Sequence, residues 1–229
     1  MLRSMFLAVL ATAALPAADL LVYEPFSGSG KVADTAGGTG FAGAWSDGHN
    51  QIVADTLASK LGETPAVSAG SLQLSAPDWG SKRQLAQPIG DKPGSWYLSC
   101  LIRNDTGEQP ENYASVKLFA GEAEVGGLGK SWMGDKWTLF GPGKEAATQA
   151  SCVTTNAAFV VVKFTYAGGS DSLHAWIDPE LASEPPVADA EVGGIALKPA
   201  DRVVVVAKKK FSIDEIRIGS TWAAVCPAK

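Results

Sequence analysis

The sequence predicts an all-β protein, a two-sheet antiparallel jelly-roll sandwich, and three observations support that prediction. The chain has 25 Gly and 13 Pro in 229 residues without a repeat period, which favours many short strands over long helices. Hydrophobic residues make up 46% of the chain and charged residues 19%, enough apolar material for a sizeable core. About ten strand-like segments follow one another without the interleaved helices that parallel sheets require.

In the first half of the chain, period-two alternation and an enrichment in β-branched or aromatic residues mark the expected strands. Within the strand at 95–103, Trp96, Leu98 and Cys100 share one face, which predicts that this face turns toward the core. Residues 55–61 and 144–150 look helical instead, and both segments are short. The expected strands cover residues 20–26, 71–75, 95–103, 114–119 and 137–140.

In the second half, clusters of Gly, Pro, Asn and Asp separate the strand-like segments. Glu184-Pro185-Pro186 predicts an exposed loop, because Pro cannot donate to a sheet ladder. Lys208-Lys209-Lys210 predicts a turn or a charged edge that discourages pairing with another chain. The expected strands cover residues 158–166, 173–178, 192–197, 202–207 and 211–218.

The N-terminal segment predicts a signal peptide at residues 1–18, followed by a single domain at residues 19–229. Arg3 supplies a positive charge, residues 5–15 supply an apolar run, and Ala17 and Ala18 offer small side chains for cleavage. The apolar run is shorter than the ~20 residues that a membrane-spanning helix needs. We therefore expect a secreted, periplasmic or cell-surface protein whose mature chain has no transmembrane segment.

Three cysteines leave at least one thiol unpaired, even in an oxidising compartment that permits disulfides. Cys100 alternates with hydrophobic residues of its strand, which predicts a small buried hydrophobic side chain. Cys152 and Cys226 are then the one pair to consider as a disulfide. Three buried free thiols are the alternative.

Composition and motifs give no sign of a nucleotide or nucleic-acid site. The formal net charge is −5, so the chain lacks the excess of basic residues with which proteins bind the phosphates of a nucleic acid. Residues 38–43 fit the letters GxGxxG, but no apolar strand precedes them and no helix follows. Residues 126–131 would end a P-loop if Glu124 were glycine. We expect that no cofactor is required.

Signals for catalysis are weak. The sequence has no GxSxG, and His49 and His174 are its two candidate bases, without the spacing of a zinc site. Asp214 and Glu215 fall on opposite faces of one strand, so they cannot act together as a glycosidase pair from that strand. The sequence leans toward a protein without catalytic activity. A hydrolase whose carboxylates come from different strands stays open.

Seven tryptophans offer flat apolar faces that either fill a core or stack on a sugar ring. Trp79 and Trp132 lie in loop-like sequence, and together with Trp176 they are the candidate carbohydrate contacts. The alternative is that all of them are packed. Asp171 and Asp178 are candidate ligands for a structural calcium ion, although no EF-hand spacing is present.

Further evidence on the fold comes from residues 21–26, 37–45, 96–99, 159–163, 176–179 and 213–219, with Trp222. Together these segments resemble secreted bacterial proteins with a concanavalin A-like, laminin-G-like (LamG) jelly roll. The resemblance implies that the first strand lies beside the last and closes the sandwich. It says little about activity, because this fold hosts lectins, adhesion modules, glucanases and structural domains.

The sequence thus favours an exported, non-enzymatic module that binds carbohydrate or another surface polymer, such as a polysaccharide or a cell-surface glycan. The first alternative is a structural or adhesive module that binds protein partners through sheet edges and acidic loops. The second alternative is a glycan-active hydrolase.

Overall fold

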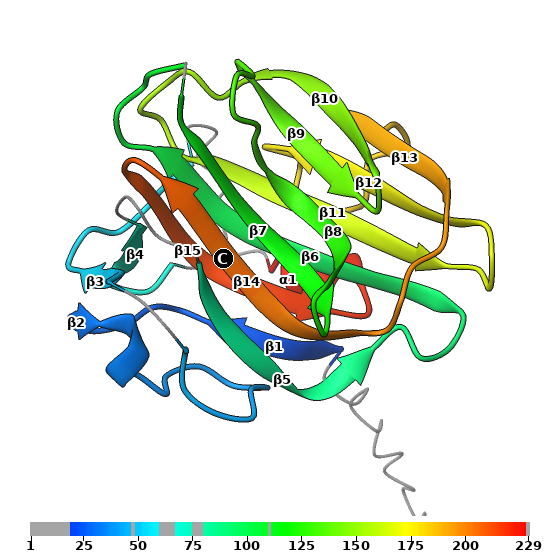
Figure 1. Ribbon diagram of the computed structural model, residues 1–229, viewed down its shortest axis with the longest axis horizontal. Coiled ribbons are helices and arrows are strands. Elements are labelled where there is room, and N and C mark those ends of the chain that lie inside the picture. The colour runs from blue at the N-terminus through cyan, green and yellow to red at the C-terminus, as the bar shows by residue number, and fades with distance from the viewer. Residues whose placement is uncertain (1–18, 47–48, 60–66, 75–79, 110, 228–229) are drawn as a thin grey trace, which may run out of the picture.

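Two antiparallel β-sheets pack face to face in the computed structural model, which describes residues 19–46, 49–59, 67–74, 80–109 and 111–227 (Figure 1). Within these residues, one sheet has nine strands in the order β13-β12-β11-β6-β15-β4-β3-β2, with β1 paired to β15. The other has six strands in the order β10-β9-β8-β7-β14-β5. This confirms the predicted all-β class and its two-sheet antiparallel sandwich.

The strands of the nine-stranded sheet are β1 (Leu20–Glu24), β2 (Gly30–Lys31), β3 (Gln51–Val53), β4 (Ser71–Leu74), β6 (Gly94–Asn104), β11 (Ala158–Tyr166), β12 (Asp171–Ile177), β13 (Ala190–Ile195) and β15 (Phe211–Gly219). Those of the six-stranded sheet are β5 (Ser81–Ile89), β7 (Tyr113–Ala120), β8 (Ala123–Lys130), β9 (Lys136–Gly141), β10 (Lys144–Ser151) and β14 (Ala200–Lys208). A 3₁₀ turn, η1 (Val32–Asp34), and a short helix, α1 (Trp222–Val225), complete the described elements. Neither helical element is long and apolar enough to cross a membrane.

The ten predicted strands are all present, and their ends agree within two residues wherever the structure describes them. The prediction of a helix at residues 144–150 is wrong, because this segment forms β10. Its Lys, Glu, Ala and Gln favour helices, but a two-residue Pro142-Gly143 turn folds it back on β9 in a hairpin. Gly143 has φ +67°, as the second central position of a type II turn requires.

Residues 55–59 are not helical either, and residues 60–61 lie outside the described part. The sequence pattern also failed to indicate the short strands β2 and β3 and the longer strands β5 and β8. In β5, the polar Ser81 and Arg83 occupy inward positions, so hydrophobic alternation is lost. In β8, Gly127 and Gly129 take positions where a Cβ would collide with the backbone of β7. The incomplete P-loop motif therefore lies in an extended strand.

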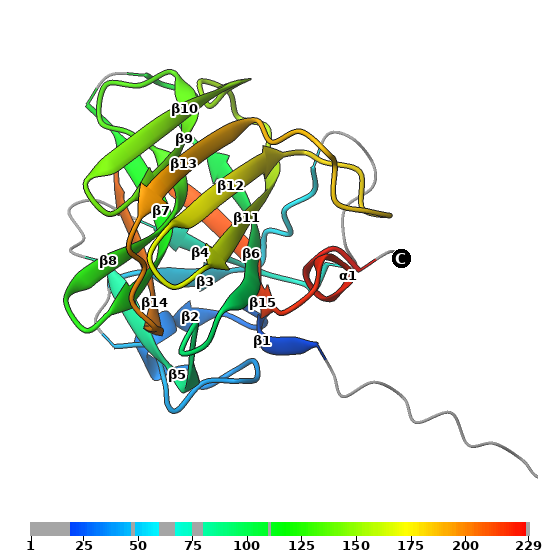
Figure 2. The same ribbon diagram turned by 90° about the vertical axis from the view of Figure 1, so that its right-hand side faces the viewer.

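The main hydrophobic core lies between the sheets, and a second cluster covers the outer face of the nine-stranded sheet. Leu98, Cys100 and Ile102 of β6 belong to the main core, as their alternation predicts. The second cluster joins residues of β6, β11 and β12 to α1 and to the β12–β13 connection. Figure 2 shows α1 on the side of this sheet that faces away from the six-stranded sheet. Covering both faces explains why β11 and β15 are buried almost throughout.

The first and last strands pair as expected. Leu20 is opposite Gly219 and Glu24 is opposite Ile216, while β15 also pairs with β4 and β6. The three cysteines are buried and unbridged, and Cys152 and Cys226 belong to separate hydrophobic clusters. The structure thus has free thiols, one of the two alternatives that the sequence left open.

A buried ion pair joins β1 to β5. Arg83 Nη1 contacts Glu24 Oε2, and the two side chains are 3% and 2% exposed. The guanidinium also donates to the carbonyls of Gly37 and Gly43, each at 2.7 Å. The carboxylate accepts Trp45 Nε1 at 3.0 Å. Arg83 therefore holds the glycine-rich loop at 37–43, which is irregular, as its sequence context predicts.

Candidate functional site

Strand register brings three connections together at one end of the sandwich. Lys208, the last residue of β14, is opposite Tyr113, the first residue of β7. Lys130 ends β8 opposite Ala114, so the β8–β9 connection leaves the sheet beside the same edge. Trp132 lies in that connection. The sequence placed Trp132 in a loop, but register alone brings Tyr113 and Lys208 to it.

We call Tyr113, Trp132, Met133 and Lys208 the Trp132 platform. Trp132 is 39% exposed and Met133 is 62% exposed. The ring centroids of Trp132 and Tyr113 are 5.8 Å apart, and the Lys208 ammonium lies 4.0 Å from the Trp132 ring centroid. These contacts orient the indole by aromatic and cation–π attraction while part of its surface stays open.

A buried lysine anchors the connections that carry the platform. Lys130 is 1% exposed, and its Nζ donates to the carbonyls of Gln109 at 2.6 Å, Asn112 at 3.0 Å and Ser131 at 3.1 Å. Burial lowers the pKa of Lys130 below its ordinary value. The three carbonyls come from the connections before β7 and after β8, so one ammonium ties both connections to the end of the sheet.

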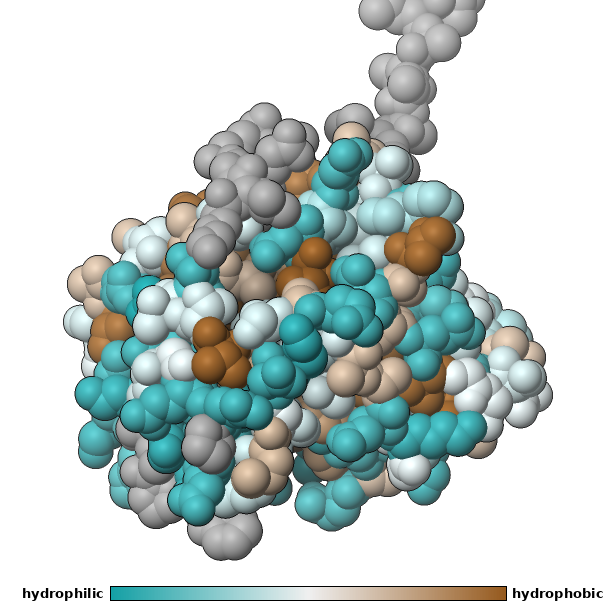
Figure 3. All heavy atoms as spheres, turned by 90° about the horizontal axis from the view of Figure 1, so that it is seen from above, coloured by the Kyte–Doolittle hydropathy of each residue, from teal (hydrophilic) through white to brown (hydrophobic). Residues whose placement is uncertain are grey.

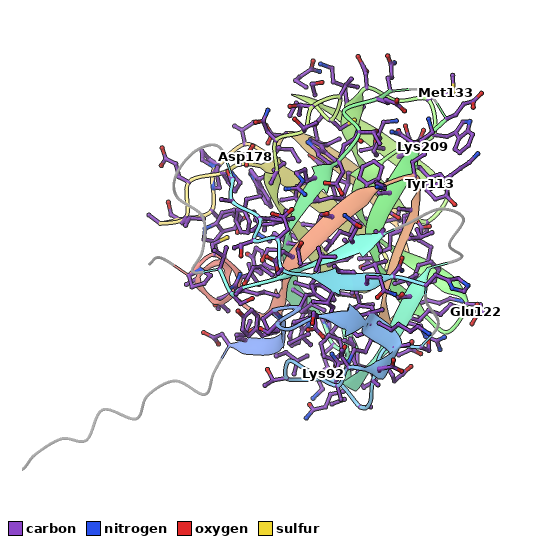
Figure 4. The ribbon with its side chains drawn as sticks, turned by 90° about the vertical axis from the view of Figure 1, so that its left-hand side faces the viewer. Lys92, Tyr113, Glu122, Met133, Asp178 and Lys209 are labelled. Carbon is purple, nitrogen blue, oxygen red and sulfur yellow. The ribbon has the colours of Figure 1, made fainter. Side chains whose placement is uncertain are left out.

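Further charged side chains lie at the same end of the molecule. Lys209 Nζ lies 3.0 Å from Glu108 Oε2, and Lys209 has φ +71° in the β14–β15 turn, which confirms the turn predicted for the three lysines. Figure 4 shows Tyr113, Met133 and Lys209 near one another at one end of the molecule. Figure 3, viewed from above Figure 1, shows hydrophobic residues as separate patches among hydrophilic ones. An apolar ring flanked by donors and acceptors can stack on a sugar and hydrogen-bond its hydroxyls.

The other two candidate tryptophans have different surroundings. Trp79 lies outside the described residues. Trp176 is 4% exposed, its Nε1 donates to Val187 O at 3.0 Å, and its ring meets Trp222 edge-on at 5.4 Å. The β12–β13 connection and α1 cover it, which strand alternation could not indicate. The Trp132 platform is thus built without Trp176.

The two candidate calcium ligands do not share a site. Asp171 begins β12 and Asp178 follows its end, so about 23 Å of strand separates them at ~3.3 Å per residue. Asp178 Oδ1 accepts Ser59 Oγ at 2.9 Å and Phe159 N at 2.8 Å. Asp171 accepts backbone N–H groups with both oxygens. No cluster of three or more His, Cys, Asp or Glu suited to a metal occurs among the residues that the structure describes.

Of the two candidate bases, His49 is exposed and His174 lies in a strand among structural partners. His174 is opposite Glu191 across β12 and β13, with Nε2 3.7 Å from Oε1, and its ring stacks on Trp176. Burial raises the pKa of Glu24 and of Asp214. Both groups are buried, at 2% and 0% exposure.

Asp214 makes stability depend on pH. Burial, followed by the nearby Glu215 carboxylate, raises the pKa of Asp214 from 3.8 to about 8. The folded state therefore holds this proton more tightly than the unfolded state, so the stability that it contributes is full below pH ~4 and is lost as pH rises through ~8. We expect Asp214→Asn to flatten the fall of unfolding free energy over this window.

Denaturant unfolding from pH 4 to 8 tests this expectation, with Asp34→Asn as the control because Asp34 is exposed. The control should follow the wild-type curve. Equal pH slopes for Asp214→Asn and the wild type would contradict the assignment.

Comparison with solved structures finds this fold at low sequence identity. The binding domain of botulinum neurotoxin serotype C1 aligns with a TM-score of 0.55 at 9% identity, over 89% of this chain and 49% of that chain. The binding domain of botulinum neurotoxin DC in complex with SialylT aligns at 0.50 and 9%, over 89% and 48%. Trypanosoma rangeli sialidase in complex with the inhibitor DANA aligns at 0.51 and 14%, over 93% and 33%.

The chain thus spans half or less of each of these proteins. No protein-family model and no curated protein matches the sequence. Identities this low establish a shared β-sandwich fold and leave the site to be argued from its own residues.

Proposed function

We propose that this chain is an exported module that binds polysaccharide or a cell-surface glycan through the Trp132 platform. The observation that carries the proposal is the part-exposed indole of Trp132, oriented by Tyr113 and Lys208 in a connection that Lys130 anchors. Such a preformed aromatic surface binds sugar rings without first ordering its own side chains.

Two further points support the proposal. The composition of residues 1–18 is that of a signal peptide, which would bring the mature chain into contact with extracellular polymers. One structure with this fold is a sialidase, and another is a binding domain in complex with SialylT.

Binding rather than hydrolysis is favoured because the described carboxyl groups with raised pKa, Glu24 and Asp214, are buried.

Binding to glycan arrays and insoluble polysaccharides tests the proposal, with and without calcium. Trp132→Ala should weaken binding roughly thirtyfold, the ~2 kcal/mol expected for a central aromatic contact. Trp132→Phe should keep part of the affinity, because it retains a smaller ring face. Val187→Ala is the control, since Val187 is 77% exposed on the connection over the other sheet.

Trp79→Ala belongs in the same series, as the second loop tryptophan that the sequence proposes. Equal affinity of wild type and Trp132→Ala would remove the platform from the binding site. Absence of binding to every polymer would overturn the proposal and favour a protein-binding role.

A further inference from the structure

The charge of Lys208 distinguishes the Trp132 platform from a purely aromatic surface. The Lys208 ammonium lies 4.0 Å from the Trp132 ring centroid, and its side chain is half-buried. Among the residues that the structure describes, no carboxylate forms an ion pair with Lys208. The platform therefore holds a cation that the indole attracts but that no acidic side chain neutralises.

A second ammonium over an aromatic ring provides an internal comparison. Lys117 of β7 places its Nζ 4.0 Å from the ring centroid of Phe140 in β9. The same Nζ lies 2.8 Å from Glu124 Oε2 of β8. The charge of Lys117 is thus balanced within the protein, whereas that of Lys208 is not. An anionic group on a ligand would supply to Lys208 what Glu124 supplies to Lys117.

The neighbouring sheet positions leave room for such an anion. Residues two apart share a strand face, so Val206 of β14 and its partner Ser115 of β7 lie next to Lys208 on the same face. Both side chains are uncharged. In the turn that follows, Glu108 pairs with Lys209 at 3.0 Å. A ligand anion can therefore reach Lys208 without meeting a carboxylate at these sheet positions.

We propose that Lys208 makes the Trp132 platform selective for acidic polysaccharides, whose sugar units carry carboxylate or sulfate groups. The inference rests on the function proposed above and names the class of glycan. The anionic group pairs with the ammonium while the sugar ring lies against the open part of the indole. A neutral sugar gains only the second contact, and it competes with Lys208 for the aromatic surface.

Affinity measurements with matched pairs of polymers and the full mature chain test the inference. Polygalacturonate and its methyl ester share a backbone, but only the first is charged at each sugar. Dextran sulfate and dextran form the corresponding pair for sulfate. At low salt we expect the acidic member of at least one pair to bind about fivefold more tightly than its neutral partner, as one exposed ion pair contributes. The preference should shrink at high salt, because ions screen exposed charges.

Three variants assign the preference to one side chain. Lys208→Met should bring the ratio of acidic to neutral affinity close to one, and Lys208→Arg should keep the preference because it keeps the charge. Lys117→Met is the matched control, since it removes an ammonium that lies over a ring but is already paired with Glu124. It should bind both members of each pair as the wild type does. Equal unfolding temperatures check that the variants are folded.

Failure of the inference and failure of the proposed function give different results. If both members of each pair bind equally well, and both bind more weakly to Trp132→Ala, the platform binds glycans without regard to charge and the inference is overturned. A preference that survives in Lys208→Met, or that disappears in Lys117→Met, also overturns it. If no polymer binds, or if Trp132→Ala binds every polymer as tightly as the wild type, the proposed function fails and the inference fails with it.

Discussion

Arg83→Met is expected to lower the free energy of unfolding by about 3–5 kcal/mol, because it leaves the Glu24 carboxylate buried without its counter-charge. Burial raises the pKa of Glu24, although the hydrogen bond from Trp45 and the charge of Arg83 each lower it. The variant also removes the donors that hold the carbonyls of Gly37 and Gly43. Chemical denaturation at neutral pH measures the loss.

Arg202→Met is the matched control. Arg202 forms ion pairs with Asp201 and Glu122 on the surface, and its side chain is 23% exposed, so its loss should cost about 0–1 kcal/mol. The double variant Glu24→Gln/Arg83→Met should recover part of the stability, since no uncompensated buried charge remains. A similar, small loss for both single arginine variants would show that the buried pair contributes no more than a surface pair.

Ending the chain at Lys210 is expected to abolish cooperative thermal unfolding. The cut removes β15, whose nine residues are all buried and which pairs with β1, β4 and β6. Without it, β1 and β4 lose their attachment to β6, and Phe211, Ile213 and Ile216 leave the main core. The stabilisation lost with this strand pairing and these core side chains exceeds the free energy of unfolding of most domains, which is ~5–15 kcal/mol.

Calorimetry and near-UV circular dichroism provide the measurement. A chain ending at Pro227 is the control, because it retains β15 and α1 and should unfold as the full chain does. A Lys210-terminated chain that melted as sharply and at the same temperature would show that the first strand does not need the last.

The sequence indicates the fold well where strands are hydrophobic on one face. In β6 the alternation of Trp96, Leu98 and Cys100 finds the element and the face that meets the main core, and in β11 the hydrophobic run finds the element. It fails for β10, where a helix-forming composition pairs with β9 through a tight turn. Tertiary pairing outweighs local propensity there, since each residue contributes less than a kcal/mol to helix preference.

The candidate site was only partly accessible to sequence reasoning. Trp132 could be singled out from its polar, glycine-containing surroundings, but its neighbours Tyr113 and Lys208 meet it through strand register. Trp176 is the opposite case, because the sequence singles it out and the structure buries it. The β12–β13 connection covers its ring, and no local pattern reports what lies above a strand.

The pairing of β1 with the end of β15 has a mechanical consequence. Leu20 and Gly219 face each other where the pair begins, and Ser220 N donates to Asp19 O beside them. Tension applied between the start of β1 and the end of β15 acts in the unzipping geometry. It loads the interstrand hydrogen bonds one after another rather than all at once. In single-molecule stretching from these ends, β1 should therefore detach first and at low force, and it would withdraw Glu24 from Arg83 as it leaves.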